Sequence, residues 1–129
     1  MPIQATFYET HNFALMTGLG RISAKDFKDY ILDFVCKDSR IKTGFLELAD
    51  MREIEGNDIT LQDMLEIVLL EQTSHRAQPS KLAFVVRDDS SYGAVRQYAA
   101  HVCVEGKQTD VFYDIDKAKQ WLGIAGIEI

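Results

Sequence analysis

The sequence lacks the features by which chains bind nucleic acid or cross membranes. Lysine and arginine total 14 against 20 acidic residues, and the net charge of −6 leaves no basic surface to attract phosphate backbones. No apolar run approaches the roughly 18 residues of a membrane span. The first ten residues contain neither the basic start nor the apolar stretch of a signal peptide. We therefore expect a cytoplasmic protein with no nucleic-acid partner and no integral membrane segment.

Cysteine and histidine are also scarce, which leaves little material for metal or redox chemistry. Cys36 and Cys103 lie far apart, so a reduced compartment is the simpler interpretation, and a bridge between them is the alternative. Both follow apolar helical segments, which predicts small, partly buried side chains. His11, His75 and His101 occur singly, whereas a zinc site needs three or four converging ligands. We expect no metal and no cofactor.

Catalytic motifs are missing as well. His101 and Cys103 are two residues apart and would face different sides of a helix, so nothing supports a catalytic triad. The segment "TGLGR" places Gly18 and Gly20 in a phosphate-binding pattern, but the third glycine position, three residues after Gly20, holds Ser23. The two glycines are instead predicted to let the chain turn from a hairpin into a helix. The sequence thus predicts a protein that is not an enzyme.

What is present indicates one domain over residues 1–129. A chain of 129 residues with 47% hydrophobic residues can bury roughly two thirds of its unfolded surface, so folding requires neither a disulfide nor a metal. Residues 3–9 and 13–17 alternate apolar and polar side chains, and "THN" between them suits a tight turn. These two segments predict an antiparallel hairpin.

The rest of the chain alternates helices with strands. Ser23 and Asp26 form a capping pattern before an apolar helix face that extends to Val35. Strands are predicted at 45–49, 81–86 and 109–113, and helices at 60–76, 91–102 and 116–123. Such alternation requires crossover connections, so we predict an α/β fold of order ββαβαβαβα with a mixed, mostly parallel sheet. Glu47 in "FLELA" indicates that part of one sheet face contacts solvent.

A ligand site in such a sheet is expected at the carboxyl ends of the parallel strands. There the sequence places Asp50 and Arg52 after one strand, then Arg87, Asp88 and Tyr92 after the next. Arginine forks suit carboxylates or phosphates, and helix N-termini add N–H donors. These five residues are our candidates for binding a ligand or partner. In the alternative interpretation, the carboxylates cap helices and the arginines pair with them to hold the loops.

Two segments contain more apolar residues than a single buried face would require. Residues 64–70, "MLEIVLL", pack in the core, with any excess forming a homodimer face or lining an apolar cavity. Met51 and Met64 would supply adaptable surface to such a cavity. The C-terminal "GIAGIEI" either packs back on the domain or extends a partner's sheet.

Four motifs follow one another along the chain: "TGLGRISAKDF", "FLELADMR", "KLAFVVRDDSSYGAVRQY" and "VFYDIDKAKQWLG". These motifs and the order of elements resemble the SpoIIAA-like superfamily, the fold of STAS-type anti-sigma-factor antagonists, which is also related to CRAL-TRIO lipid-binding domains. The last two motifs look most like a small bacterial branch without a defined biochemical activity. The resemblance covers nearly the whole chain. It implies a superhelix of sequential parallel strands and a role in regulation or ligand binding more than in catalysis.

The antagonists carry a phosphorylatable serine in an Asp-Ser-Ser-Gly type motif before the helix that follows the third strand. The matching segment here, "EGNDITL", has no serine, and Thr60 is its hydroxyl residue. Thr60 fits a capping role, and phosphorylation there is the alternative. A phosphate would meet a helix N-terminus favourably, but it would also meet Glu55, Asp58 and Asp63.

Three functions follow as hypotheses. The first is a non-catalytic regulatory or binding domain that acts through a protein partner or a small ligand, with a homodimer as one form of partnership. The second is a carrier of an apolar small molecule or lipid, which requires an internal cavity. The third is an enzyme that uses the rim of Asp50, Arg52, Arg87 and Asp88, which requires a carboxyl of raised pKa beside a preformed pocket.

Overall fold

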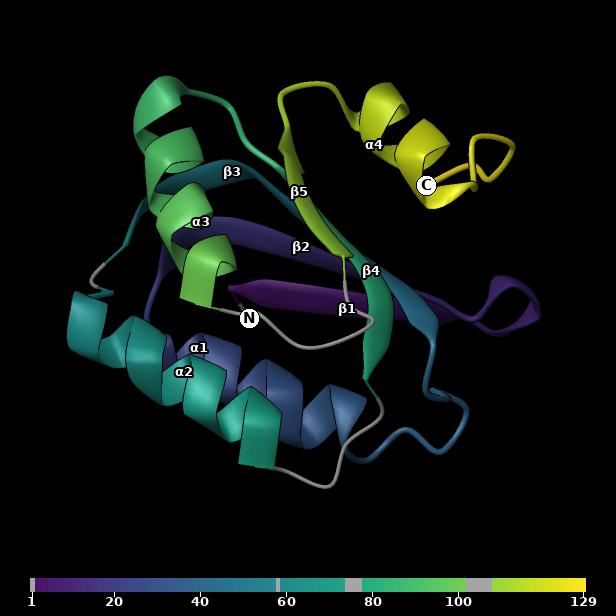
Figure 1. The fold of residues 1–129 in the computed structure, drawn as a ribbon, viewed down its shortest axis with the longest axis horizontal. Coiled ribbons are helices and arrows are strands. Elements are labelled where there is room, and N and C mark those ends of the chain that lie inside the picture. The colour runs from purple at the N-terminus through teal and green to yellow at the C-terminus, as the bar shows by residue number, and fades with distance from the viewer. Residues whose placement is uncertain (1, 58, 74–77, 102–107) are drawn as a thin grey trace.

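The computed structural model describes residues 2–57, 59–73, 78–101 and 108–129, and its framework is a five-stranded sheet. The strands lie in chain order (Figure 1). They are β1 (Ile3–Tyr8), β2 (Phe13–Ile22), β3 (Phe45–Asn57), β4 (Pro79–Val85) and β5 (Gln108–Phe112). β1 and β2 are antiparallel, and the following pairs are parallel. The predicted mixed, mostly parallel sheet with an N-terminal hairpin is confirmed.

A short helical turn closes the hairpin as predicted. η1 (Glu9–His11) is a single 3-10 turn, and it brings Tyr8 opposite Phe13 in the register of β1 and β2. Asn12 ends the turn at φ 48°, in the left-handed region that asparagine tolerates better than most residues. The Tyr8 and Phe13 rings stack with their centroids 5.3 Å apart, and this side-chain contact supports the register of the two strands.

The helices form two layers around the sheet. They are α1 (Ala24–Asp29), which continues into the π-helix η2 (Tyr30–Val35), then α2 (Leu61–Thr73), α3 (Asp89–His101) and α4 (Ile115–Leu122). Figure 1 shows α1 and α2 side by side, with α4 and the C-terminus far from them. The element order ββαβαβαβα is therefore confirmed. Residues 74–76 and 102 of the predicted helices lie outside the described ranges.

Helix starts follow the sequence closely. The Asp26 N–H donates to Ser23 Oγ at 3.4 Å, and the Ser23 N–H donates to Asp26 Oδ2 at 2.8 Å, which completes the predicted capping box. Asp63 and Thr60 form the same reciprocal pair before α2, with both distances 3.1 Å. Each cap contributes about 1 kcal/mol to helix stability because it satisfies N–H groups that have no partner within the helix.

The two faces of the sheet have separate apolar cores. The alternation of side chains along β3 and β4 sends Phe45, Ala49, Leu82 and Phe84 toward α1, η2, α2 and α3. The residues between them point to the other face, where α4 covers a second cluster. Its buried members are Phe13, Leu48, Ala83, Val85, Ala118, Leu122 and Ile124. Ile127 also packs there, so most of the C-terminal segment folds back on the domain, while Ile129 is exposed.

β2 and β3 are both longer than the sequence predicted. They continue as a parallel pair to Ile22 and Asn57, so Gly18 and Gly20 lie inside β2 and the predicted turn there is wrong. Register shifts on both sides of Gly18–Gly20 allow the strand to continue, and Gly20 adopts a φ of 68°. A Cβ atom on Gly18 would lie 2.7 Å from Ile54 Cδ1, so the Ile54 side chain packs directly over this glycine.

Two predictions about individual side chains are also wrong. Glu47 does not mark a solvent-facing sheet surface, because it is only 5% exposed and faces the larger core. Its carboxyl is tolerated there because a tyrosine donates to it, as described below. Cys36, expected to be partly buried, is exposed at the end of η2, and Cys103 lies outside the described ranges. Within those ranges, no helix combines the length and apolar character needed to cross a membrane.

Candidate functional site

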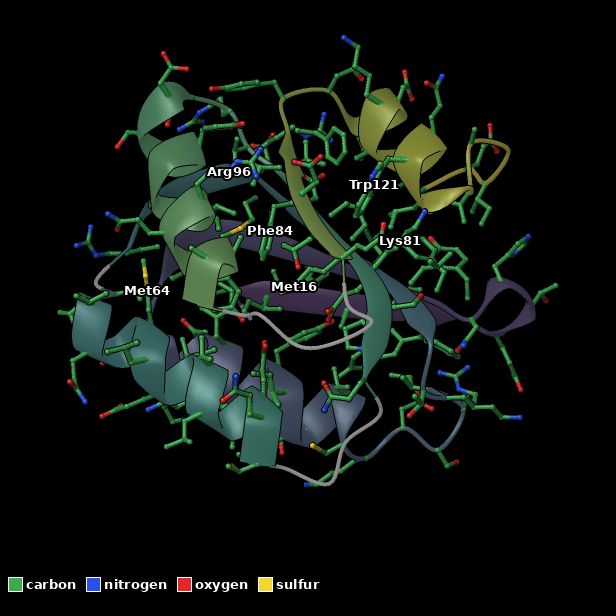
Figure 2. All side chains as sticks on the ribbon, viewed as in Figure 1. Met16, Met64, Lys81, Phe84, Arg96 and Trp121 are labelled. Carbon is green, nitrogen blue, oxygen red and sulfur yellow. The ribbon has the colours of Figure 1, made fainter. Side chains whose placement is uncertain are left out.

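A cavity of about 190 Å³ lies between the sheet and the layer of α1, η2, α2 and α3. Its walls are mostly apolar, and the polar lining side chains are Tyr30, Glu47, Glu71, Ser91 and Tyr98. The apolar lining residues are Met16, Ile22, Phe27, Ile31, Ala49, Met51, Ile54, Ile59, Met64, Ile67, Leu82, Phe84, Val86, Ala94 and Val95. Figure 2 shows Met16 and Phe84 near the centre of the view, to the side of α3, and Met64 at the start of α2.

Strand alternation explains which side chains reach the cavity. Glu47, Ala49 and Met51 are two residues apart along β3 and share one face, as do Leu82 and Phe84 along β4. The long β2–β3 ribbon extends the floor of the cavity past the end of β4 and brings in Ile54. The sequence prediction that Met51 and Met64 would line an apolar cavity is confirmed.

Two pairs of side chains put carboxyl groups against this apolar space. Tyr30 on η2 donates its hydroxyl to Glu47 Oε2 on β3 at 2.7 Å. Tyr98 on α3 donates to Glu71 Oε1 on α2, also at 2.7 Å. Each bond joins two elements, so the pairs hold the helical layer in place over the cavity. A buried carboxyl without such a donor would cost several kcal/mol of stability.

Part of the cavity lining lies near the carboxyl ends of the strands, where ligands are expected in open α/β sheets. It comes from the second half of β3 and the N-terminal parts of α2 and α3, where Met51, Met64 and Ser91 are half-buried. Glu71 and Tyr98, toward the other ends of these two helices, are half-buried as well.

The charged side chains among the described lining residues are all acidic. Among the described lining residues there are two glutamates but no lysine, arginine or histidine. The described ranges also contain no group of three histidine, cysteine or acidic side chains placed to hold a metal ion. The cavity thus combines apolar walls with the hydrogen-bond acceptors of two carboxyl groups.

Asp50 and Arg52, two of the residues predicted to bind a ligand, form an ion pair on the other face of the sheet. Arg52 donates Nε to Asp50 Oδ1 at 3.0 Å and Nη2 to Asp50 Oδ2 at 2.9 Å. This bidentate bond raises the pKa of the Arg52 guanidinium. They follow Leu48 along β3 on the face that α4 covers, so they lie away from the cavity.

The other three residues predicted to bind a ligand, Arg87, Asp88 and Tyr92, support α3 and the loop before it. Asp88 accepts the N–H of Ser91 at 2.8 Å, and this bond lowers the pKa of the Asp88 carboxyl. Arg87 donates Nη2 to the Ile54 carbonyl at 3.4 Å. Tyr92 stacks on Tyr113 with centroids 5.2 Å apart. The structure therefore does not gather the five predicted residues into one pocket, and none of them lines the cavity described above.

Thr60 lies at the start of α2, where it caps the helix through Asp63. The capping interpretation is confirmed, and phosphorylation at Thr60 stays a prediction. Ile59 beside it lines the cavity. A modification at Thr60 would therefore lie next to a residue of the cavity lining.

Sequence reasoning named Met51 and Met64 as cavity residues but did not find the polar side chains of the lining. Glu47 carried the available signal, since an acidic residue within the apolar run "FLELA" requires a partner if it is buried. Tyr30 and Tyr98 gave no signal of their own, because each sits at a regular position on an apolar helix face. Their pairing with carboxyl groups depends on how the helices cross the sheet.

Comparison with solved structures identifies the fold. The chain is similar to an uncharacterized protein of the DUF3478 family from Shewanella loihica, described as having a SpoIIAA-like fold. The two share 18% sequence identity with a TM-score of 0.61, over 93% of this chain and 91% of the other. The SpoIIAA-like fold expected from the motifs is therefore confirmed. No protein-family model matches the chain, and no curated protein matches its sequence.

Proposed function

We propose that this protein is a non-catalytic binding domain whose ligand is a small, largely apolar molecule held in the cavity. One observation carries the proposal: a space of about 190 Å³ with mostly apolar walls lies inside the larger core. Protein interiors are packed as densely as organic crystals and leave few voids larger than a water molecule. Apolar walls with a few polar groups are typical of small-molecule pockets.

The size of the cavity limits the ligand. It is somewhat larger than the roughly 150 Å³ apolar cavity that is known to hold benzene. One aromatic ring with a short substituent, or a branched chain of similar bulk, would fill it. A long lipid chain would exceed this volume and would have to extend out of the cavity. The geometry therefore favours a compact ligand over the long-chain alternative.

Methionine methyl groups provide a direct test. Met16, Met51 and Met64 all line the cavity, and Trp121, the single tryptophan, packs with the core on the opposite face of the sheet. We expect 2-phenylethanol to shift the three methyl resonances in a ¹³C-methionine NMR titration. The Trp121 indole resonance is the internal control and should stay in place. Native mass spectrometry of freshly purified protein, repeated after denaturation, would reveal a retained ligand.

A matched pair of variants tests whether the methionine methyl shifts come from binding in the cavity. Ala94→Phe places a ring in the cavity, whereas Ala100→Phe makes the same change on an exposed position of the same helix. We expect Ala94→Phe to abolish the methyl shifts and Ala100→Phe to preserve them. Equal shifts in both variants, or shifts that include Trp121, would show that the probe binds elsewhere and would contradict the proposal.

A second candidate function, self-association, is favoured by an exposed row of leucines on α2. Leu61, Leu65 and Leu69 are 59%, 42% and 58% exposed and are spaced four residues apart on one helix face. Such a row can pack antiparallel against its own copy across a two-fold axis near Leu65. The apolar surface of all three leucines would then be buried from solvent in the dimer interface.

Light scattering coupled to size-exclusion chromatography would measure this association. We expect a concentration-dependent dimer that Leu65→Lys converts to a monomer. Gln120→Lys introduces the same charge at an exposed position of α4, on the opposite face of the sheet from α2, and is the control. A monomer at all concentrations, or equal loss of the dimer in both variants, would exclude this surface as the interface.

A further inference from the structure

We infer that the cavity selects a compact apolar amine, held by its ammonium group against Glu47 and Glu71, over an alcohol or a carboxylate of the same size. This inference rests on the proposed function and specifies the chemistry of its ligand. It starts from the polar groups of the lining, which come from η2, β3, α2 and α3 and face a shared apolar space.

The hydrogen bonds at these groups favour a ligand that donates. The hydroxyls of Tyr30 and Tyr98 are both donated to carboxyl oxygens, at 2.7 Å in each case. One phenol hydrogen does not saturate the Glu47 carboxylate, because a carboxylate accepts at about four lone-pair sites. Glu47 is almost fully buried, so a donor within the cavity is the natural way to satisfy its remaining acceptor capacity.

The charge of the lining excludes anionic ligands. Two carboxyl groups and no basic side chain occur among the described lining residues, so a bound carboxylate or phosphate would meet only like charge. In a poorly hydrated site this repulsion is much stronger than in water. An ammonium group is instead attracted by these carboxyl groups, and the poorly hydrated site strengthens this attraction as well. The three N–H donors of the ammonium group match the acceptor oxygens of these carboxyl groups.

Aromatic rings suit the same ligand. Phe27, Tyr30, Phe84 and Tyr98 all contribute to the walls of the cavity. The face of an aromatic ring attracts a cation, and it also packs against the apolar body of a ligand. A compact amine with one ring or a short branched chain therefore meets both the carboxyl groups and the apolar walls within the available volume.

Three probes of nearly equal size separate the ligand classes. Binding of 2-phenylethylamine, 2-phenylethanol and phenylacetate would be measured by calorimetry and by the methionine methyl titration at neutral pH. We expect the amine to bind at least about tenfold more tightly than the alcohol, which corresponds to about 1.4 kcal/mol. Phenylacetate should show no binding.

Two isosteric variants test the role of the carboxyl groups. Glu47→Gln and Glu71→Gln should each weaken amine binding by about tenfold or more and should leave binding of the alcohol nearly unchanged. Glu71 is less buried than Glu47, so its variant remains informative if Glu47→Gln folds poorly. Glu66→Gln, an exposed position on the same helix as Glu71, is the control and should bind the amine as the unmodified protein does.

The outcomes separate this inference from the proposed function. If the alcohol or phenylacetate binds as tightly as the amine and shifts the same methyl groups, the cavity is a ligand site and the amine inference is overturned. If none of the three probes shifts Met16, Met51 or Met64, both the inference and the proposed function fail. Amine binding that Glu66→Gln weakens as much as Glu71→Gln does would place the amine on the acidic surface and overturn the inference.

Discussion

Removal of the Tyr30 hydroxyl tests whether the buried Tyr30–Glu47 bond holds the helical layer to the sheet. Tyr30→Phe retains the ring, its stacking on Phe34 at a centroid distance of 5.6 Å, and almost all of the buried apolar area. It removes the donor that lies 2.7 Å from Glu47 Oε2. Any loss of stability therefore reports on the polar interaction and not on a packing defect.

The expected magnitude follows from the burial of Glu47. At 5% exposure, its carboxyl gains little from water when the tyrosine donor is lost. Hydrogen bonds to charged groups contribute about 1.5–3 kcal/mol, so we expect Tyr30→Phe to lower the free energy of unfolding by about 2 kcal/mol. The double variant with Glu47→Leu replaces both partners by apolar groups. Its loss of unfolding free energy should be smaller than the summed losses of the two single variants by at least about 1 kcal/mol.

Urea unfolding followed by far-ultraviolet circular dichroism measures these differences, provided that the slope with urea is equal in all variants. Tyr8→Phe is the control, because Tyr8 is a half-buried tyrosine stacked on Phe13 in the other core. It should change stability by less than about 0.5 kcal/mol. A Tyr30→Phe effect of that small size, or strict additivity in the double variant, would refute a stabilising role for the Tyr30–Glu47 bond.

Three further predictions concern other parts of the chain. Thr60→Ala removes the cap of α2 and should lower the free energy of unfolding by about 1 kcal/mol, measured in urea, with the less costly Thr60→Ser as the comparison. The hydrogen bond from Tyr113 to Asp89 raises the pKa of the Tyr113 phenol to about 12, so Asp89→Asn should return it toward 10 in an ultraviolet titration. Gly18→Ala should force Ile54 to move, lower stability by about 1–3 kcal/mol and shift the methionine methyl resonances of the cavity.

The pH dependence that follows from Tyr113 has a definite sign. The raised pKa means that the folded state holds this proton more tightly than the unfolded state, whose phenol titrates near 10. The bond therefore stabilises the fold below pH 10, and its contribution is lost as the pH rises toward 12. A Tyr113 titration unchanged by Asp89→Asn would contradict this assignment. Likewise, an unchanged methyl spectrum in Gly18→Ala would show that Ile54 does not transmit the change.

The sequence was sufficient for the order and type of the main elements. Local signals decide these features: the capping residues Ser23 and Thr60 start helices, and alternating or continuous apolar runs define the strands. The carboxyl end of the sheet also followed from the sequence, since parallel strands with crossover helices direct their loops there. These signals act over a few residues and need no knowledge of distant contacts.

Strand length needed the tertiary structure. Nothing local distinguishes the segment from Gly18 to Ile22 from a turn, because glycine weakens a strand and allows many backbone conformations. The segment is a strand because β3 lies beside it up to Asn57 and supplies hydrogen-bond partners. For the same reason Asp50 and Arg52 belong to the body of a strand and pair with each other across one of its faces.

Only the tertiary structure decided where the site lies. The sequence favoured the charged residues at the ends of strands, and most of them are engaged in caps, ion pairs and ring contacts. The cavity arises from the way three helical segments cross the sheet and from the paired placement of Tyr30 with Glu47 and of Tyr98 with Glu71. A hydrogen bond between residues 17 or 27 positions apart depends on chain topology. The sequence by itself therefore determined the framework, and packing between its layers determined the space that a ligand would occupy.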